Sequence, residues 1–146
     1  MLKSEPTTYS IDDLRRDGAT YWSGVRNFQA RNFMRDQMRV GDGILFYHSN
    51  IPPIGISGFA EVSQSGYPDF TAWDPSDGHY DPKSRPDDPV WFMVDIRYVR
   101  HGREVITLAQ IKAHPALQKM GVVQRGTRLS VQPVHYNEWD VIIHLA

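Results

Sequence analysis

The fold class is decided by the stretch Val90-Trp91-Phe92-Met93-Val94-Asp95-Ile96-Arg97-Tyr98. Its even-numbered residues are all apolar or aromatic, whereas Asp95 and Arg97 occupy odd positions. Because successive side chains of a β-strand point to opposite faces, this alternation predicts a strand with one face in a core. Gly102 follows shortly afterwards, and we expect a hairpin-like turn there.

Other segments before and after this stretch also have strand patterns. Ile44–His48 is a continuous run of mostly apolar residues, which predicts a strand buried on both faces. Ile54–Val62 alternates with small residues such as Gly55 and Gly58, as a strand of a tightly curved barrel requires. Shorter strands are expected at Met1–Ser4 and Leu129–Gln132. Many short strands without a βαβ rhythm predict an α+β fold, a mixed β-barrel flanked by short α-helices.

Capping residues mark where helices begin. Ser10 and Asp13 form a capping-box pattern that opens a short helix, which we expect to end before Gly18. Asn27 is a suitable N-cap for a second helix over Phe28–Gln37. Further helical pieces are expected at residues 107–113, 115–120 and 137–145.

The segment from Tyr67 to Pro89 is the one long stretch without a periodic pattern. It holds five of the ten prolines, at positions 68, 75, 82, 86 and 89. Structureless loops of this length are uncommon inside compact domains and are usually functional or mobile. We expect this loop to be one or the other.

Length and composition are those of one globular domain over residues 1–146, with 40% hydrophobic and 23% charged residues. No apolar run is long enough to span a membrane, and the first residues lack a secretory signal, so we expect a cytoplasmic protein, or a nuclear one in a eukaryote. There is no cysteine, which excludes disulfides, thiolate metal sites and cysteine nucleophiles. The net charge of −1 argues against a general coat on nucleic acid, so any such affinity must come from a local basic face and a shaped pocket.

Enzyme motifs are missing from the sequence. The nearest approach to a nucleophile elbow, Gly55–Gly58, lacks the required spacing, and neither a P-loop nor a dinucleotide fingerprint is present. We therefore expect no catalytic residue, no cofactor and no bound metal. Two other hypotheses remain: a small hydrolase or nucleotide-processing enzyme that uses His48 or the Asp74–Asp81 loop, and a protein-interaction module.

Among the possible enzymatic sites, the Asp74–Asp81 loop has the best case, because it could bind a metal ion. Its potential metal ligands are Asp74, Asp77, His79 and Asp81. The competing interpretation is a solvated acidic loop rich in turn-forming residues, and we favour it.

Polar and aromatic residues at the ends of the predicted elements point to a pocket. Trp22 ends an extended piece, and Arg26, Asn27 and Gln29 follow near a helix start. A planar ligand such as a nucleobase stacks on an aromatic ring and pairs its edge with amides. Ser49 and Asn50 would add polar groups. On the residues alone, the interpretation of Trp22 as a core residue and of Asn27 as a simple helix cap is slightly favoured. The series Arg31, Arg35 and Arg39 is either a phosphate track or a solubilising face.

Several blocks, taken together, resemble the EVE domain family. They are Lys3-Ser4-Glu5-Pro6, the run from Trp22 to Asn32, Phe46-Tyr47-His48-Ser49-Asn50, Tyr80-Asp81-Pro82-Lys83-Ser84 and Arg128-Leu129-Ser130-Val131-Gln132-Pro133-Val134. The blocks follow one another from end to end of the chain. Three shorter matches, Lys3-Ser4, Trp22-Ser23 and Gly58-Phe59-Ala60, are similar to the YTH readers of methylated adenine.

The resemblance implies a PUA-like β-barrel that binds nucleic acid, RNA or DNA, by reading a modified base in a pocket. Trp22 would be the stacking wall, and Trp73 is our candidate for the second aromatic wall. The expected ligand-binding residues are Lys3, Ser4, Glu5, Trp22, Ser23, Arg26, Asn27, Gln29, Ser49, Asn50, Trp73 and Ser130. The expected phosphate contacts are Lys3, Arg26, Arg31 and Arg35.

Overall fold

Five strands make a single mixed sheet in the computed structural model, which describes residues 1–126 and 128–146. The strands are β1 (Leu2–Ser4), β2 (Ala19–Trp22), β3 (Gly43–His48), β4 (Gly55–Pro68) and β5 (Phe92–Thr107). Their order is β1-β3-β4-β5-β2, with β1 parallel to β3 and the other pairs antiparallel. β1 and β2 are the two edges, so the sheet is open and does not close into the predicted barrel.

One of the small residues of β4 makes room for a helix. A Cβ on Gly58 would lie 2.6 Å from the Ile11 side chain and 2.8 Å from the Arg100 carbonyl oxygen. The missing side chain therefore lets the first helix pack directly on the sheet. Register shifts of β4 against β5 interrupt the regular pairing, for example between Ile56 and Gly58 and between Val62 and Gln64.

The helices pack around the sheet, and the first two begin where their capping residues predicted. They are α1 (Ile11–Asp17), α2 (Phe28–Asp36), α3 (Leu108–Ala113) and α4 (Tyr136–Leu145), with short 3₁₀ helices η1 (Phe70–Trp73) and η2 (Pro115–Leu117). Ser10 and Asp13 form the expected capping box, and Asn27 caps α2. Two local predictions are wrong: β5 continues through Gly102 without a turn, and the Leu129–Gln132 segment contributes an isolated bridge from Val131 to Leu2.

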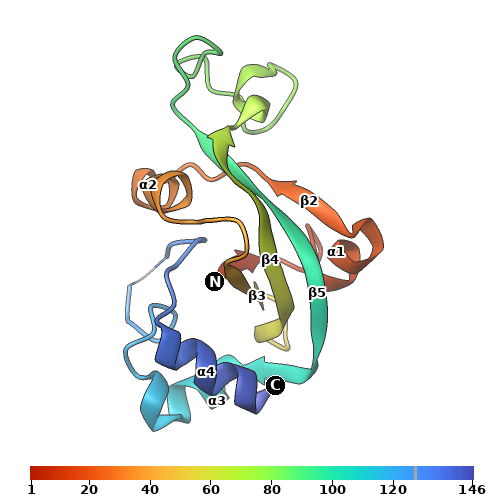
Figure 1. Cartoon of the computed structure of the whole chain (residues 1–146), viewed down its shortest axis with the longest axis vertical. Coiled ribbons are helices and arrows are strands. Elements are labelled where there is room, and N and C mark those ends of the chain that lie inside the picture. The colour runs from red at the N-terminus through yellow and green to blue at the C-terminus, as the bar shows by residue number, and fades with distance from the viewer. Residues whose placement is uncertain (127) are drawn as a thin grey trace.

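Helices on both sides of the sheet enclose two hydrophobic cores (Figure 1). One core joins α1 and α2 to the sheet through residues such as Leu14, Met34 and Phe46, all fully buried. The other joins α3, η2 and α4 to the sheet through residues such as Leu45 and Ile142. Burying one such side chain stabilises the fold by about 1.5–3 kcal/mol, so both cores hold the sheet rigidly beneath its loops.

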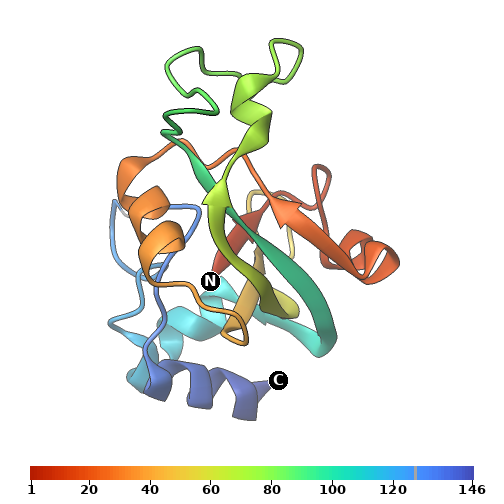
Figure 2. The same cartoon turned by 45° about the horizontal axis from the view of Figure 1, so that its top comes forward.

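The long segment between β4 and β5 projects from one end of the molecule and contains η1 (Figures 1 and 2). The piece that joins β2 to α2 crosses beneath it (Figure 2), and Gly24 and Arg26 of this piece hydrogen-bond to the long segment. No helix in the described ranges is long and apolar enough to span a membrane.

Candidate functional site

A cavity of about 410 Å³ opens beside Trp22 at the end of β2. Its walls come from β1, the turn before α1, β2 and the long loop, and its lining residues are Ser4, Thr8, Tyr9, Thr20, Tyr21, Trp22, Ser23 and His79. The Trp22 ring meets Phe46 edge-on at 5.6 Å and Tyr9 at 6.2 Å between ring centroids. Trp22 therefore belongs both to the core and to the cavity wall.

Hydroxyl groups give this cavity a polar rim. Ser4 Oγ donates to the Tyr9 carbonyl oxygen at 2.6 Å, which holds the turn before α1 against β1. The Tyr9 hydroxyl donates to Asp17 Oδ2 at 2.7 Å. Burial and the interaction with Asp17 raise the pKa of Tyr9 to about 12. Its phenol is thus uncharged at neutral pH.

The long loop closes one side of the cavity through His79. Its imidazole ring packs so tightly on Gly24 that a Cβ there would lie 2.5 Å from His79 Nε2. Gly24 also has a φ of +82°, a conformation that residues with side chains rarely adopt. His79 Nδ1 lies 3.1 Å from Asp77 Oδ1, which orients the ring. The glycine two residues after Trp22 is therefore what lets the loop reach the cavity.

Asp69 is the residue that our sequence analysis missed. Its buried carboxylate accepts hydrogen bonds from the Gly24 amide (2.9 Å), the Thr71 amide (2.9 Å) and Arg26 Nη1 (3.0 Å). Burial alone raises the pKa of Asp69, but the hydrogen bonds to Thr71, Gly24 and Arg26 bring the pKa below its ordinary value. In sequence this residue resembles any turn-forming aspartate, so no local signal distinguishes it.

Arg26 braces the same junction. Its Nη2 donates to the His79 carbonyl oxygen at 2.7 Å while Nη1 pairs with Asp69. The arginine predicted to contact phosphate therefore ties the cavity wall to the long loop.

The structure also gathers the predicted polar residues at the ends of β1 and β3. Asn50 Nδ2 donates to Glu5 Oε1 at 2.6 Å, and the Ser49 amide donates to the Ser4 carbonyl oxygen at 2.9 Å. The Lys3 amide donates to the Ser130 carbonyl oxygen at 2.9 Å. Lys3 Nζ lies 5.8 Å from the centre of the Tyr47 ring, and burial lowers the pKa of Lys3. This cluster adjoins the cavity through Ser4.

Three of the predicted ligand residues line the cavity: Ser4, Trp22 and Ser23. Others lie apart from it. Asn27 Oδ1 accepts from the Ala30 amide as a helix cap, and Gln29 is exposed on α2. Trp73 ends η1 and is not one of the described residues that line the cavity. The other rings at the cavity belong to Tyr9, Tyr21 and His79, which share no sequence motif.

His48, which the enzymatic hypothesis would use in catalysis, has a structural role. His48 Nε2 accepts the Ile11 amide hydrogen at 3.1 Å, so this nitrogen is unprotonated and helps to cap α1. Burial lowers the pKa of His48, which favours the same neutral form.

The acidic loop likewise uses its carboxylates to form turns. Asp74, Asp77 and Asp81 each accept a hydrogen bond from a backbone amide two residues ahead. In the described residues, no group of three histidine or carboxylate side chains is arranged to hold a metal ion.

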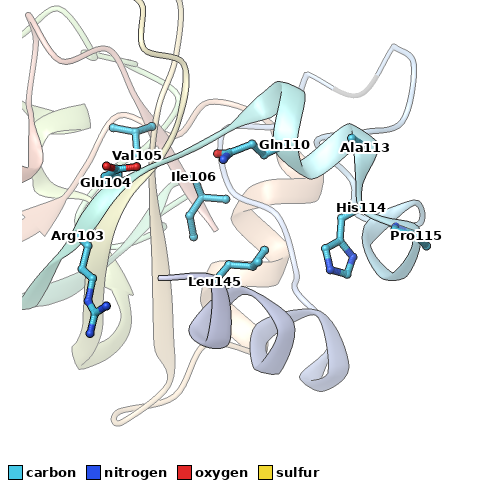
Figure 3. A pocket seen from close by; sticks show the side chains of 9 residues that line it. All are labelled: Arg103, Glu104, Val105, Ile106, Gln110, Ala113, His114, Pro115 and Leu145. Carbon is cyan, nitrogen blue, oxygen red and sulfur yellow. The ribbon is translucent and has the colours of Figure 1, made fainter.

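A larger hollow, about 630 Å³, lies at the opposite end of the molecule among β5, α3, η2 and α4. Figure 3 shows Ile106 and Leu145 facing one another across it, with His114 nearby. None of the residues predicted to bind a ligand lines this hollow, so it is separate from the Trp22 cavity.

Comparison with known proteins assigns the chain to a family. The sequence profile of the EVE domain matches residues 1–145. This chain belongs to the EVE domain family. This chain is 40% identical to human thymocyte nuclear protein 1 over 163 aligned residues. The alignment covers 99% of this chain and 72% of that protein. The chain is 40% identical over 164 residues to the chicken protein of the same name, covering 67% of that protein.

Solved structures have the same fold as this EVE domain. A Pseudomonas putida protein superposes with a TM-score of 0.95 at 44% identity, covering 99% of this chain and 97% of the other. Human THYN1 protein in complex with 5-methylcytosine containing DNA superposes with a TM-score of 0.92 at 38% identity, covering 99% and 94%. The predicted family and its PUA-like α+β architecture are therefore confirmed, with an open sheet in place of a barrel.

Proposed function

We propose that this EVE domain binds nucleic acid by taking a modified base into the Trp22 cavity. The observation that carries the proposal is an aromatic wall and several hydroxyl groups around one cavity of about 410 Å³. That volume lies within the roughly 300–1,000 Å³ typical of ligand pockets. A base stacks on an aromatic face, and hydroxyls read the donors and acceptors of its edge.

Two further observations favour a base as the ligand. The chain has a net charge of −1, so recognition through a shaped pocket suits it better than a charged coat. Human THYN1, which shares the fold at a TM-score of 0.92, has been crystallised with 5-methylcytosine containing DNA. DNA that carries 5-methylcytosine is therefore the first probe, and modified RNA is the second.

The cavity residues would divide the work. Trp22 stacks on the base, whereas Ser4 and Ser23 contact its edge. Asp69 and Arg26 act indirectly, since their hydrogen bonds hold Gly24 and His79 in place. Lys3, on β1, lies over the Tyr47 ring and is a further candidate for a phosphate contact.

The test is a fluorescence-anisotropy titration at a stated salt concentration. Matched DNA and RNA oligonucleotides with and without a modified base are compared on the wild-type protein and on Trp22→Ala. Stacking contributes about 1–3 kcal/mol per base, so Trp22→Ala should bind the preferred oligonucleotide roughly 5- to 150-fold more weakly.

Because Trp22 also packs on Phe46, Trp22→Phe serves as the matched variant that keeps a stacking ring. Urea denaturation of each variant checks that the domain is folded. A wild-type protein that binds no oligonucleotide, or a folded Trp22→Ala that binds as well as wild type, would contradict the proposal.

A further inference from the structure

Phe28 is an exposed aromatic residue whose ring is held in place by a buried tryptophan. Its ring stacks on Trp91 with 4.8 Å between centroids and 22° between planes, yet 57% of the residue remains exposed. Trp91 is 6% exposed, and its Nε1 donates to Asp81 Oδ2 at 2.7 Å. The tryptophan is thus immobilised below, and the phenylalanine ring is presented to solvent in a set orientation.

Arginine side chains flank this stack. Arg31 Cζ lies 4.8 Å from the centre of the Phe28 ring and 5.9 Å from that of Trp91. Arg26 Cζ lies 5.3 Å from the Trp91 ring, and Arg35 Cζ lies 5.6 Å from the Phe92 ring. We call this surface the arginine–aromatic strip, defined by Arg26, Phe28, Arg31, Arg35, Trp91 and Phe92.

Arg31 differs from the neighbouring arginines in the partners of its guanidinium group. Arg26 pairs with Asp69, and Arg35 pairs with Asp36 at 2.8 Å. Arg31 instead donates to the Val90 carbonyl oxygen and to the Asn32 side chain, and it forms no ion pair with any carboxylate of the described residues. A fixed guanidinium without a carboxylate partner suits a phosphate.

The strip is continuous with the Trp22 cavity. His79 lines the cavity, its carbonyl oxygen accepts from Arg26, and Arg26 lies over Trp91, on which Phe28 stacks. Figure 2 shows the segment from β2 to α2, to which Arg26 belongs, passing beneath the long loop. A strand whose modified base enters the cavity would therefore continue over Arg26 towards Phe28.

We propose that the arginine–aromatic strip binds the nucleic-acid strand next to the captured base. Phe28 stacks on a neighbouring base, and Arg31 contacts the adjoining phosphate. This inference rests on the proposed function and adds a second contact to it. Modified and unmodified strands make this contact equally well, because every base has a face on which an aromatic ring can stack.

The test compares Phe28→Ala, Phe28→Leu, Arg31→Gln and Trp22→Ala with the wild-type protein. The ligands are a modified oligonucleotide, its unmodified match and the modified mononucleotide. Phe28→Leu keeps an apolar cover on Trp91, and Tyr136→Ala removes an 82% exposed aromatic residue from α4 as a matched control.

We expect both Phe28 variants to lose affinity about 5-fold or more for the modified and unmodified oligonucleotides alike, leaving their affinity ratio unchanged. Binding of the mononucleotide should not change, because one nucleotide fills the cavity without reaching the strip. Arg31→Gln should reduce the slope of log K against log salt concentration by about 0.7–0.9. Tyr136→Ala should bind as wild type.

Other outcomes separate this inference from the proposed function. If Trp22→Ala loses binding while Phe28→Ala does not, the strip is overturned and the cavity stands. If Phe28→Ala alters the affinity ratio or weakens mononucleotide binding, Phe28 belongs to the cavity and the inference is overturned. If the wild-type protein binds none of the ligands, both proposals are overturned.

Discussion

At the scale of a single residue, Gly24 links the cavity wall to the long loop. Its φ is +82°, and the His79 ring occupies the space where a side chain would begin. Its amide also donates to Asp69. One position thus determines the path of the backbone after Trp22 and the place of the ring that closes the cavity.

Gly24→Ala should lower the free energy of unfolding by roughly 1–2 kcal/mol through backbone strain, as expected for a side chain in a left-handed conformation. It should also push His79 away from the cavity, since the new Cβ would lie 2.5 Å from His79 Nε2. Urea denaturation measures the first effect. The affinity for the preferred modified oligonucleotide measures the second and should fall.

Gly18→Ala is the matched control for that prediction. Gly18 has a φ of +76°, but nothing lies within 4 Å of its would-be Cβ. It should lose a similar stability and keep its affinity. A Gly24→Ala protein that binds as tightly as Gly18→Ala would show that the position of His79 does not matter to the ligand.

At the scale of an element, α1 is held by contacts from elsewhere in the chain. His48 on β3 accepts the Ile11 amide hydrogen, and Gly58 on β4 leaves room for the Ile11 side chain. The capping box of Ser10 and Asp13 supplies the local part of the helix start. A helix of seven residues depends on such tertiary contacts, because short helices are marginal on their own.

The contact with His48 predicts a pH dependence. Burial lowers the pKa of His48 below its ordinary value of 6.5, whereas nearby Asp12 and Asp13 oppose this shift and His101 adds to it. As the pH falls below about 6.5, the unfolded chain binds the proton first, so the free energy of unfolding decreases. The contribution is fully present above that pH.

His48→Gln cannot titrate at this position, so its free energy of unfolding should fall less steeply than that of wild type between about pH 7 and 5. Urea denaturation across this range measures both slopes. Equal slopes for His48→Gln and wild type would contradict the assignment.

At the scale of the whole molecule, 16 basic and 17 acidic residues leave a net charge of −1. Cationic groups for a nucleic acid must therefore be concentrated locally. Arg26, Arg31 and Arg35 lie against the aromatic rings of the strip. Lys3, the fourth residue predicted to contact phosphate, lies beside Tyr47 of the other core. The surface that we propose for nucleic acid is consequently small.

This distribution predicts a shallow salt dependence. With at most four phosphate contacts, the slope of log K against log salt concentration for duplex DNA should be no steeper than about −3.6. Titrations between roughly 50 and 200 mM salt measure it. A slope near −10 would indicate an extended electrostatic surface and would contradict binding through a cavity and a strip.

Local sequence patterns predicted several elements of this fold correctly, but they missed contacts between distant segments. The alternation of Val90–Tyr98 and the caps at Ser10 and Asn27 predicted elements that the structure contains. Gly102 was taken for a turn because a glycine in an exposed strand has the same local appearance. Trp22 was found through its family motif, whereas Tyr9, Tyr21 and His79 join it at the cavity from separate elements.

Local patterns were enough to predict the main strands, the first helix starts and the family, because periodicity, caps and motif blocks belong to short segments. The tertiary structure decided that the sheet stays open, that Asp69 holds Gly24 from 45 positions away, and that Phe28 stacks on Trp91. The physical reason is that these features depend on hydrogen bonds and ring contacts between distant segments. Such contacts exist only once the sheet has brought those segments together.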